Sequence, residues 1–383
     1  VYKRQELESS QNDILNGTDD SLMKQNWLDA LADKPKQGAN VEVTIDPALQ
    51  QAAYDQLVGP GYEGSAVAIQ PSTGKILAMA SNPGYNPNDL MGDSAEETWA
   101  NLQEQEGQPL VNHAGAETLP PGSIFKIITT AAGLNNGFDP SSTLTGSNVI
   151  TLPDTVTELT NYANQKCNGQ DAVTLQTAFA LSCNTAFVEM SEQLGADELR
   201  KYAKAFGVGE NYDLGVSTSA GTLGDLPDGA ATAQSAIGQR DVTMTALQAA
   251  VMAGTVANKG TRMQPYLVNR ITDAQMKDVR TTKPKKADQA VNEETAATLT
   301  DLMYASERSS WGYDGNGFAS KTGTAEHGEG LAPHVWYVAF DPERDIAVGV
   351  VVKNGGNLGE SATGGKVSGP IGRAILRAYQ GEQ

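Results

Sequence analysis

The segment from His334 to Asp341, with the sequence HVWYVAFD, is apolar on both faces of an extended strand. A strand that faces water on one side alternates apolar and polar residues, so this pattern indicates a sheet that is covered on both sides. Strand patterns also precede and follow this segment, in GFASKTGTAE and DIAVGVVVKNG. The chain must therefore supply helices for two faces of one sheet.

Two more strand patterns lie near the other end of the chain. The sequence GSAVAIQPSTGKILAMAS, residues 64–81, has two apolar runs joined by the turn residues PSTG, which predicts a hairpin. A hairpin alone is barely stable in water, so we expect it to join the three C-terminal strands in one sheet. Helical patterns fill much of the stretch from Ser123 to Glu307, which predicts a helical block inserted between the two parts of the sheet.

Charge and composition exclude several classes of function. The chain has 27 basic and 46 acidic side chains and a formal charge of -19, which argues against nucleic acid as a partner. No apolar run approaches the roughly 18 residues of a spanning helix, and no signal-peptide pattern is present. The chain begins at Val1 rather than Met, so we expect it to be a piece of a longer polypeptide.

A serine lies three positions before a lysine in PPGSIFKIITTAAGL, at Ser123 and Lys126. The same S-x-x-K spacing occurs at Ser21 and at Ser72, but Ser72 falls in the predicted hairpin turn. For an isolated pair of this kind, a helix cap followed by a solvated lysine is the more common explanation. A buried lysine at this spacing would instead have a lowered pKa and could act as a base toward the serine.

Two further short motifs follow Ser123 along the chain. LSCNTAF supplies Ser182 and Asn184 after an apolar helical pattern, and ASKTGTAE supplies a K-T-G triplet that begins at Lys321. Taken singly, the first motif is also typical of a turn and the second of a strand followed by a turn. Their order after Ser123 matches the S-x-x-K, S-x-N and K-T-G set of the penicillin-recognising serine enzymes.

With these motifs, the chain resembles the transpeptidase domain of class B penicillin-binding proteins. The similarity extends to VTIDPALQ, STGKILAMAS, SAIGQRDVTMTALQ and HVWYVAF and covers most of residues 41–380. LSCNTAF, SKTGTAEHG and SATGG are most similar to the actinobacterial penicillin-binding protein A group. The resemblance implies an α+β fold of the β-lactamase/transpeptidase type, with a mainly antiparallel five-stranded sheet, flanking helices and an inserted all-helical subdomain.

The resemblance also implies catalytic roles. Ser123 would be the acylated nucleophile, and Lys126 would be its general base. Ser182 would pass a proton toward the leaving amine, and Lys321 would place positive charge beside Ser182. Asn184 would hydrogen-bond the amide of the substrate. No cofactor is implied.

The K-T-G segment is implied to bind the substrate. Thr322, Gly323 and Thr324 would contact a D-Ala-D-Ala terminus, with the two threonines holding its carboxylate. The backbone N–H groups of Ser123 and Thr324 would form the oxyanion hole, because a tetrahedral intermediate requires preorganised donors. The substrates implied are peptidoglycan stem peptides, and β-lactam antibiotics would be covalent inhibitors.

The same resemblance places the protein at the extracytoplasmic face of the bacterial membrane. Residues 41–383 would form the penicillin-binding transpeptidase domain, and residues 1–40 would be the remnant of an N-terminal linker or pedestal. A transmembrane anchor and contacts with cell-wall synthesis or division machinery are expected in regions outside this chain. Outside the cytoplasm disulfides persist, so we expect Cys167 and Cys183 to form a bridge.

Several alternatives remain at this point. A serine β-lactamase, a D,D-carboxypeptidase and a non-catalytic β-lactam sensor share the fold, although no convincing acidic deacylation motif lies between Asn184 and Lys321, where LGDLPDGA occurs. A hydrolase with a His-containing triad is disfavoured, because no G-x-S-x-G motif is present. His327, Glu329 and His334 are residue types that can bind a metal, but a solvated loop between two strands explains the same sequence, and we expect no metal.

Overall fold

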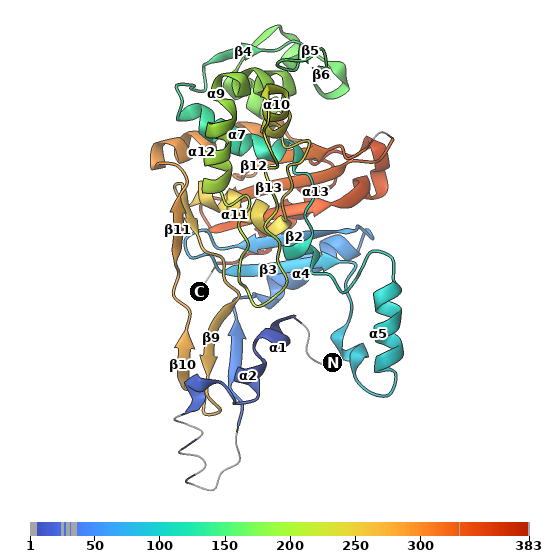
Figure 1. Ribbon diagram of the computed structural model, residues 1–383, viewed down its shortest axis with the longest axis vertical. Helices are drawn as coiled ribbons and strands as arrows, with labels where there is room; N and C mark the ends of the chain where they lie inside the picture. Colours follow the sequence, from blue (N-terminus) through green and yellow to red (C-terminus); the bar gives the residue numbers. More distant parts are fainter. Residues whose placement is uncertain (1–5, 24–26, 28–30, 32–36, 329, 382–383) are drawn as a thin grey trace.

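The computed structural model describes residues 6–23, 27, 31, 37–328 and 330–381. Figure 1 shows a helical block at one end of the molecule, a central sheet, and a narrow arm at the other end that contains α1, α2, β9 and β10. Within the described ranges, no helix combines the length and the apolar character that are needed to cross a bilayer.

The central sheet has five antiparallel strands in the order β12-β13-β14-β2-β3. It contains the predicted hairpin, β2 (Gly64–Ile69) and β3 (Ile76–Asn82), and the three C-terminal strands, β12 (Ala319–Ala325), β13 (His334–Asp341) and β14 (Ile346–Val352). β14 joins the two parts of the sequence because Val350 pairs with Ala66. The prediction that both chain ends build one sheet is confirmed.

Helices cover both faces of this sheet. On one face lie α11 (Ala246–Ala257) and α12 (Glu293–Ser309), and on the other lie α4 (Pro47–Val58) and α13 (Ser368–Ala378). Every residue of β13 is buried, as its two-sided apolar pattern predicts. The α+β architecture therefore follows from the need to cover a strand that has no polar face.

The inserted block contains four main helices. They are α7 (Lys126–Leu134), α8 (Leu175–Leu181), α9 (Asn184–Ala205) and α10 (Gly229–Ala236). The block is not purely helical, and the expectation of an all-helical subdomain is corrected to that extent. Short strands pair as β4 (Thr143–Thr145) with β7 (Ala172–Thr174), and as β5 (Val149–Thr151) with β6 (Glu158–Thr160). Strands of three residues are too short to show a readable alternation.

The arm is built from segments that are distant in sequence. β1 (Asn40–Val43), β9 (Val268–Thr272) and β10 (Asp278–Thr281) form a three-stranded sheet, and β8 (Thr261–Met263) pairs with β11 (Lys286–Gln289). The remaining helical elements are α1 (Glu6–Ser10), α2 (Asn12–Leu15), η1 (Asp20–Leu22), η2 (Pro87–Leu90), α5 (Ala95–Glu104), α6 (His113–Ala116), η3 (Gly122–Phe125), η4 (Tyr162–Asn164), η5 (Cys167–Gly169) and η6 (Lys353–Ser361).

Candidate active site

Ser123 lies in η3, and α7 begins three residues later at Lys126. The side chain of Ser123 is half-buried, whereas that of Lys126 is completely buried. No side chain caps either helix, so Ser123 is not the ordinary cap that its sequence context allowed. Its hydroxyl has no protein hydrogen-bond partner within the described residues, which leaves it available to a substrate.

The segment that carries Ser123 is held against the free edge of the sheet. The Gly122 N–H donates to the Gly238 carbonyl at 2.9 Å, and the indole N–H of Trp336 donates to the Pro120 carbonyl at 2.8 Å. Gly122 has a φ of 54°, and a Cβ atom there would come within 2.9 Å of the Thr324 carbonyl oxygen. Glycine is required because both the conformation and the close approach exclude a side chain.

The amine of Lys126 has well-defined partners. Its Nζ atom lies 2.8 Å from the Ser182 carbonyl oxygen, 2.8 Å from Asn184 Oδ1 and 3.4 Å from Ser182 Oγ. The first two atoms only accept hydrogen bonds, so they use both N–H groups of a neutral amine. The lone pair of that amine is then free to accept a proton from a serine hydroxyl.

Lys321 approaches Ser182 from β12. Its Nζ atom donates to Ser182 Oγ at 2.9 Å and to the Thr322 carbonyl at 3.1 Å. Ser182 Oγ is therefore within hydrogen-bonding range of both lysines. The structure thus brings Lys126, Ser182, Asn184 and Lys321 into one cluster.

Ser182 sits at a strained point between α8 and α9. Its φ of 62° and ψ of 39° are left-handed, a conformation that is uncommon for a residue with a side chain. A disulfide joins the next residue, Cys183, to Cys167. Asn184 begins α9, and its Nδ2 atom donates to the Thr160 carbonyl at 3.0 Å, which fixes the orientation of its amide.

Burial perturbs both lysines strongly. Desolvation, together with the nearby charge of Lys321, holds the pKa of Lys126 well below its usual value, and desolvation lowers the pKa of Lys321 to about 7. Neither amine pairs with a carboxylate in the described part of the chain. The rings of Phe187 and Phe179 lie 5.2 and 5.7 Å from the Nζ atoms of Lys126 and Lys321, respectively. These rings favour the charged forms of the lysines only weakly in comparison.

Alternation along β12 separates the K-T-G residues. Lys321 and Gly323 are buried, whereas Thr322 and Thr324 are half-exposed on the other face of the strand. A Cβ atom on Gly323 would lie 2.7 Å from the Pro121 carbonyl oxygen, so this glycine permits the contact between β12 and the Ser123 segment. Thr324 Oγ1 accepts a hydrogen bond from the Gly364 N–H at 3.4 Å.

A buried polar network stabilises β12 beneath the cluster. Ser320, which precedes Lys321, donates to the carboxylate of Glu307, and the same carboxylate accepts from Tyr337 Oη at 2.9 Å. Arg373 Nε from α13 lies 2.7 Å from Glu307 Oε1. Sequence analysis did not identify these residues, because each stands alone in its segment.

Other site residues that the sequence analysis did not identify lie close to the motifs along the sequence. Phe187 lies three residues after Asn184 in α9, a spacing that places helical side chains on the same face. Phe179 lies three residues before Ser182. Trp336 lies within the apolar segment from which the sheet was predicted. A buried indole N–H requires a hydrogen-bond acceptor, so the position of Trp336 in an apolar segment could have indicated such a contact.

The competing motifs lie elsewhere. The hydroxyls of Ser72 and Ser21 donate to the carboxylates of Asp345 and Asp19. His327 and His334 stack with ring centroids 3.9 Å apart, and Glu329 lies outside the described residues. Within the described ranges, no group of three or more His, Cys, Asp or Glu side chains is arranged to hold a metal ion.

Comparison with known proteins identifies this arrangement. Residues 64–377 match the penicillin binding protein transpeptidase domain, and residues 1–41 match the penicillin binding protein A dimerisation domain. The chain belongs to the penicillin-binding protein transpeptidase family. The family resemblance of the motifs is thereby confirmed.

Individual members of the penicillin-binding protein family are similar over nearly the whole chain. The peptidoglycan D,D-transpeptidase PbpA of Mycolicibacterium smegmatis is 43% identical over 98% of this chain and 80% of its own length. The structure of penicillin-binding protein A from M. tuberculosis in its penicillin G acyl-enzyme complex has a TM-score of 0.92 and 40% identity, covering 97% of this chain and 88% of that one. The D,D-transpeptidase domain from Eggerthella lenta has a TM-score of 0.81 and 26% identity, covering 98% and 86%.

Proposed function

We propose that this penicillin-binding protein is a peptidoglycan D,D-transpeptidase, which cross-links stem peptides through an acyl-enzyme on Ser123. The observation that carries the proposal is the pair of buried lysines that meet at Ser182. One of them, Lys126, follows by three residues the half-buried Ser123, whose hydroxyl has no partner within the described residues. A neutral amine and an ammonium group in one site provide a base and a positive charge together.

In the acylation step, Lys126 takes the proton of the Ser123 hydroxyl, and the oxygen attacks the carbonyl of the penultimate D-alanine. The backbone N–H groups of Ser123 and Thr324 stabilise the oxyanion. The carbon–nitrogen bond then breaks, and the departing D-alanine amine receives a proton through Ser182. Asn184 has one amide N–H that is not used by Thr160, and this group orients the substrate.

The acyl group then transfers to an amine. The amine of a second stem peptide attacks the ester, loses a proton to the basic site, and releases the Ser123 hydroxyl. The positive charge of Lys321 attracts the substrate carboxylate, and Thr322, Gly323 and Thr324 bind it along β12. The edge position of β12 supports this role, because one side of the strand has no sheet partner.

The molecular context follows from the same function. Residues 41–383 form the transpeptidase domain, and residues 1–40 belong to the N-terminal region of a protein anchored at the extracytoplasmic face of the membrane. Cell-wall synthesis or division proteins would contact regions outside this chain. The relatives' names and the disulfide between Cys167 and Cys183 support an extracytoplasmic site.

Intact mass spectrometry with penicillin G tests the nucleophile. We expect a stable adduct on the wild-type chain and on Ser72→Ala, which removes the serine of a second S-x-x-K motif, but none on Ser123→Ala. An adduct that persists on Ser123→Ala would refute the assignment. Rapid release of the adduct from wild type would favour a β-lactamase.

Turnover of a peptide ending in D-Ala-D-Ala, with and without an added amino acid acceptor, tests the reaction itself. A transpeptidase forms the amide product in proportion to the acceptor. Hydrolysis alone would identify a carboxypeptidase, and acylation by penicillin without peptide turnover would identify a sensor.

A further inference from the structure

A cavity lies at the edge of the central sheet farthest from Ser123. Its volume is about 490 Å³, which is in the range of small-molecule binding sites. β3 forms this edge, whereas β12 forms the catalytic edge four strand positions away. The cavity is therefore separate from the candidate active site.

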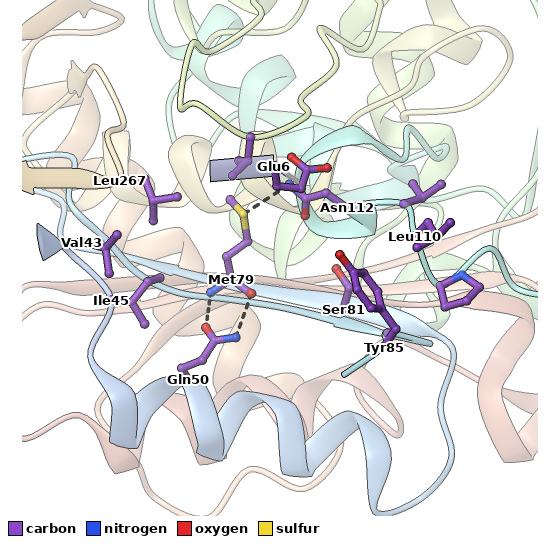
Figure 2. Close-up of a pocket in the computed structure, with 14 residues that line it drawn as sticks. Glu6, Val43, Ile45, Gln50, Met79, Ser81, Tyr85, Leu110, Asn112 and Leu267 are labelled. Carbon is purple, nitrogen blue, oxygen red and sulfur yellow. Dashed lines mark hydrogen bonds between the residues drawn. The ribbon is translucent and has the colours of Figure 1, made fainter. Parts of the chain in front are cut away.

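The wall of the cavity is mainly apolar and comes from several segments. Figure 2 shows Met79, Tyr85 and Leu110 around it, with Val43 and Ile45 of the arm and Leu267 on one side. Elements of the arm, the sheet and the connecting loops thus line one open space. A site built at such a junction is typical of ligand pockets in proteins.

The sheet edge inside this cavity cannot accept another strand at Met79. Gln50 Nε2 donates to the Met79 carbonyl at 2.9 Å, and the Met79 N–H donates to Gln50 Oε1 at 2.7 Å, as the dashed lines in Figure 2 show. Thr44 Oγ1 and the Asp46 N–H occupy the carbonyls of Ile76 and Leu77. An extended peptide therefore finds the backbone groups of Met79 and the carbonyls of Ile76 and Leu77 already used, which favours a compact ligand over an added strand.

One charged side chain, Glu6, borders the cavity, and it is acidic. Glu6 Oε2 accepts from the Ser217 N–H at 2.5 Å, but Glu6 Oε1 has no donor within the described residues. The amide nitrogen of Asn112 donates to the Ser217 carbonyl at 2.9 Å, and its amide oxygen has no donor within the described residues. Among the described residues that line the cavity, none is basic.

Negative charges on Glu6 and Glu8 also act on Tyr85, which lines the cavity. Burial, with the negative charges of Glu6 and Glu8, raises the pKa of Tyr85. The Tyr85 hydroxyl, which is neutral at physiological pH even at its ordinary pKa, adds no charge to the cavity. A ligand that fits must fill an apolar space and present a hydrogen-bond donor with positive charge at its border.

We propose that this cavity is a binding site for a small amphiphile with an apolar body and one ammonium group, the body packing on Met79, Tyr85 and Leu110 and the ammonium group donating to Glu6 Oε1. This assignment rests on the shape and charge of the cavity and is independent of the reaction at Ser123.

Displacement of the fluorescent apolar probe N-phenyl-1-naphthylamine from the whole chain tests the proposal. The competitors are decylammonium, decanoate and decanol at concentrations below micelle formation, which share one chain length and differ in charge. We expect decylammonium to bind about tenfold more tightly than decanoate. Equal affinities of the two ions for the wild-type chain would overturn the assignment.

Matched variants locate the site. Val216→Trp fills the cavity and should weaken probe and decylammonium binding at least tenfold, whereas Val58→Trp, at the exposed end of α4, should not. Glu6→Gln should remove the preference for decylammonium over decanoate without changing decanol binding, whereas Glu97→Gln on the surface of α5 should preserve that preference.

Circular dichroism establishes whether each variant is folded. If Val216→Trp is unfolded, Leu110→Trp replaces it as the cavity-filling variant. Unchanged binding in a folded cavity-filling variant would show that the amphiphile binds elsewhere, and an unchanged ion preference in Glu6→Gln would exclude the proposed charge contact.

Discussion

The Nζ atom of Lys321 lies 2.9 Å from the Oγ atom of Ser182, although the two residues are 139 positions apart in the sequence. This contact joins the edge strand of the sheet to the junction of α8 and α9. Lys126 reaches the same hydroxyl from α7 at 3.4 Å. The hydroxyl of Ser182 therefore links two amines whose proton affinities burial has lowered.

The rate of acylation by penicillin should depend on pH in a bell-shaped manner. Lys126 must be neutral to act as a base, so the rate rises with pH through its lowered pKa. Lys321 must be charged to attract the carboxylate, so the rate falls as the pH exceeds about 7, the pKa of Lys321. Stopped-flow acylation between pH 5 and 9 measures both limbs.

Replacement of the base tests the rising limb. We expect Lys126→Met to reduce the acylation rate by roughly 10²- to 10⁴-fold, the usual contribution of a general base. Lys75→Met, in the S-x-x-K motif of the hairpin turn, is the matched control and should acylate at the wild-type rate. Wild-type kinetics in Lys126→Met would exclude it as the base.

Replacement of Lys321 should stabilise the protein at low pH. The folded pKa of about 7 lies below the ordinary value of 10.5, so the unfolded chain binds more protons between these values. The free-energy cost of burying the charged Lys321 amine is fully present below pH 7 and disappears as the pH rises toward 10.5. Lys321→Met should therefore increase the free energy of unfolding at pH 6 by on the order of 5 kcal/mol.

Urea unfolding of Lys321→Met at pH 6 and at pH 9 measures this effect. The gain should shrink at the higher pH, and penicillin acylation should be slower at neutral pH. Lys366→Met removes an exposed lysine and should show no such change. A gain that is equal at both pH values would contradict the lowered pKa.

The disulfide should support both stability and catalysis. It closes a separation of 16 residues, for which the chain-entropy model gives roughly 3 kcal/mol. Because Cys183 adjoins the strained Ser182, the double variant Cys167→Ser, Cys183→Ser should unfold at a lower temperature and acylate more slowly. Titration of the oxidised wild-type chain should find no free thiol. Two titratable thiols would disprove the bridge.

The indole of Trp336 should position the nucleophile. Trp336→Phe preserves most of the apolar volume but removes the hydrogen bond to the Pro120 carbonyl. We expect acylation to slow about tenfold, because small displacements of a nucleophile are costly. Trp311→Phe, at an exposed indole, is the control and should have no effect. If both variants react equally fast, Trp336 has no positioning role.

Much of this molecule was predictable from local sequence. Residues 334–341 required a sheet covered on both faces, and the hairpin at residues 64–81 was too small to stand alone. The S-x-x-K, S-x-N and K-T-G motifs each occupy a few neighbouring residues, so they could be recognised from the sequence alone. The short strands β4 to β7 were not, because three residues show no alternation.

Only the tertiary structure decided the chemical state of the site. The sequence names Lys126 and Lys321 as candidates, but their burial depends on helices and strands far away in the chain. The same holds for the left-handed Ser182 and for the contact between Trp336 and Pro120. Spacing along a chain determines which side chains share one helix or strand. Desolvation and hydrogen bonding across elements depend on how those elements pack, and this packing sets the pKa values and contacts at Ser182.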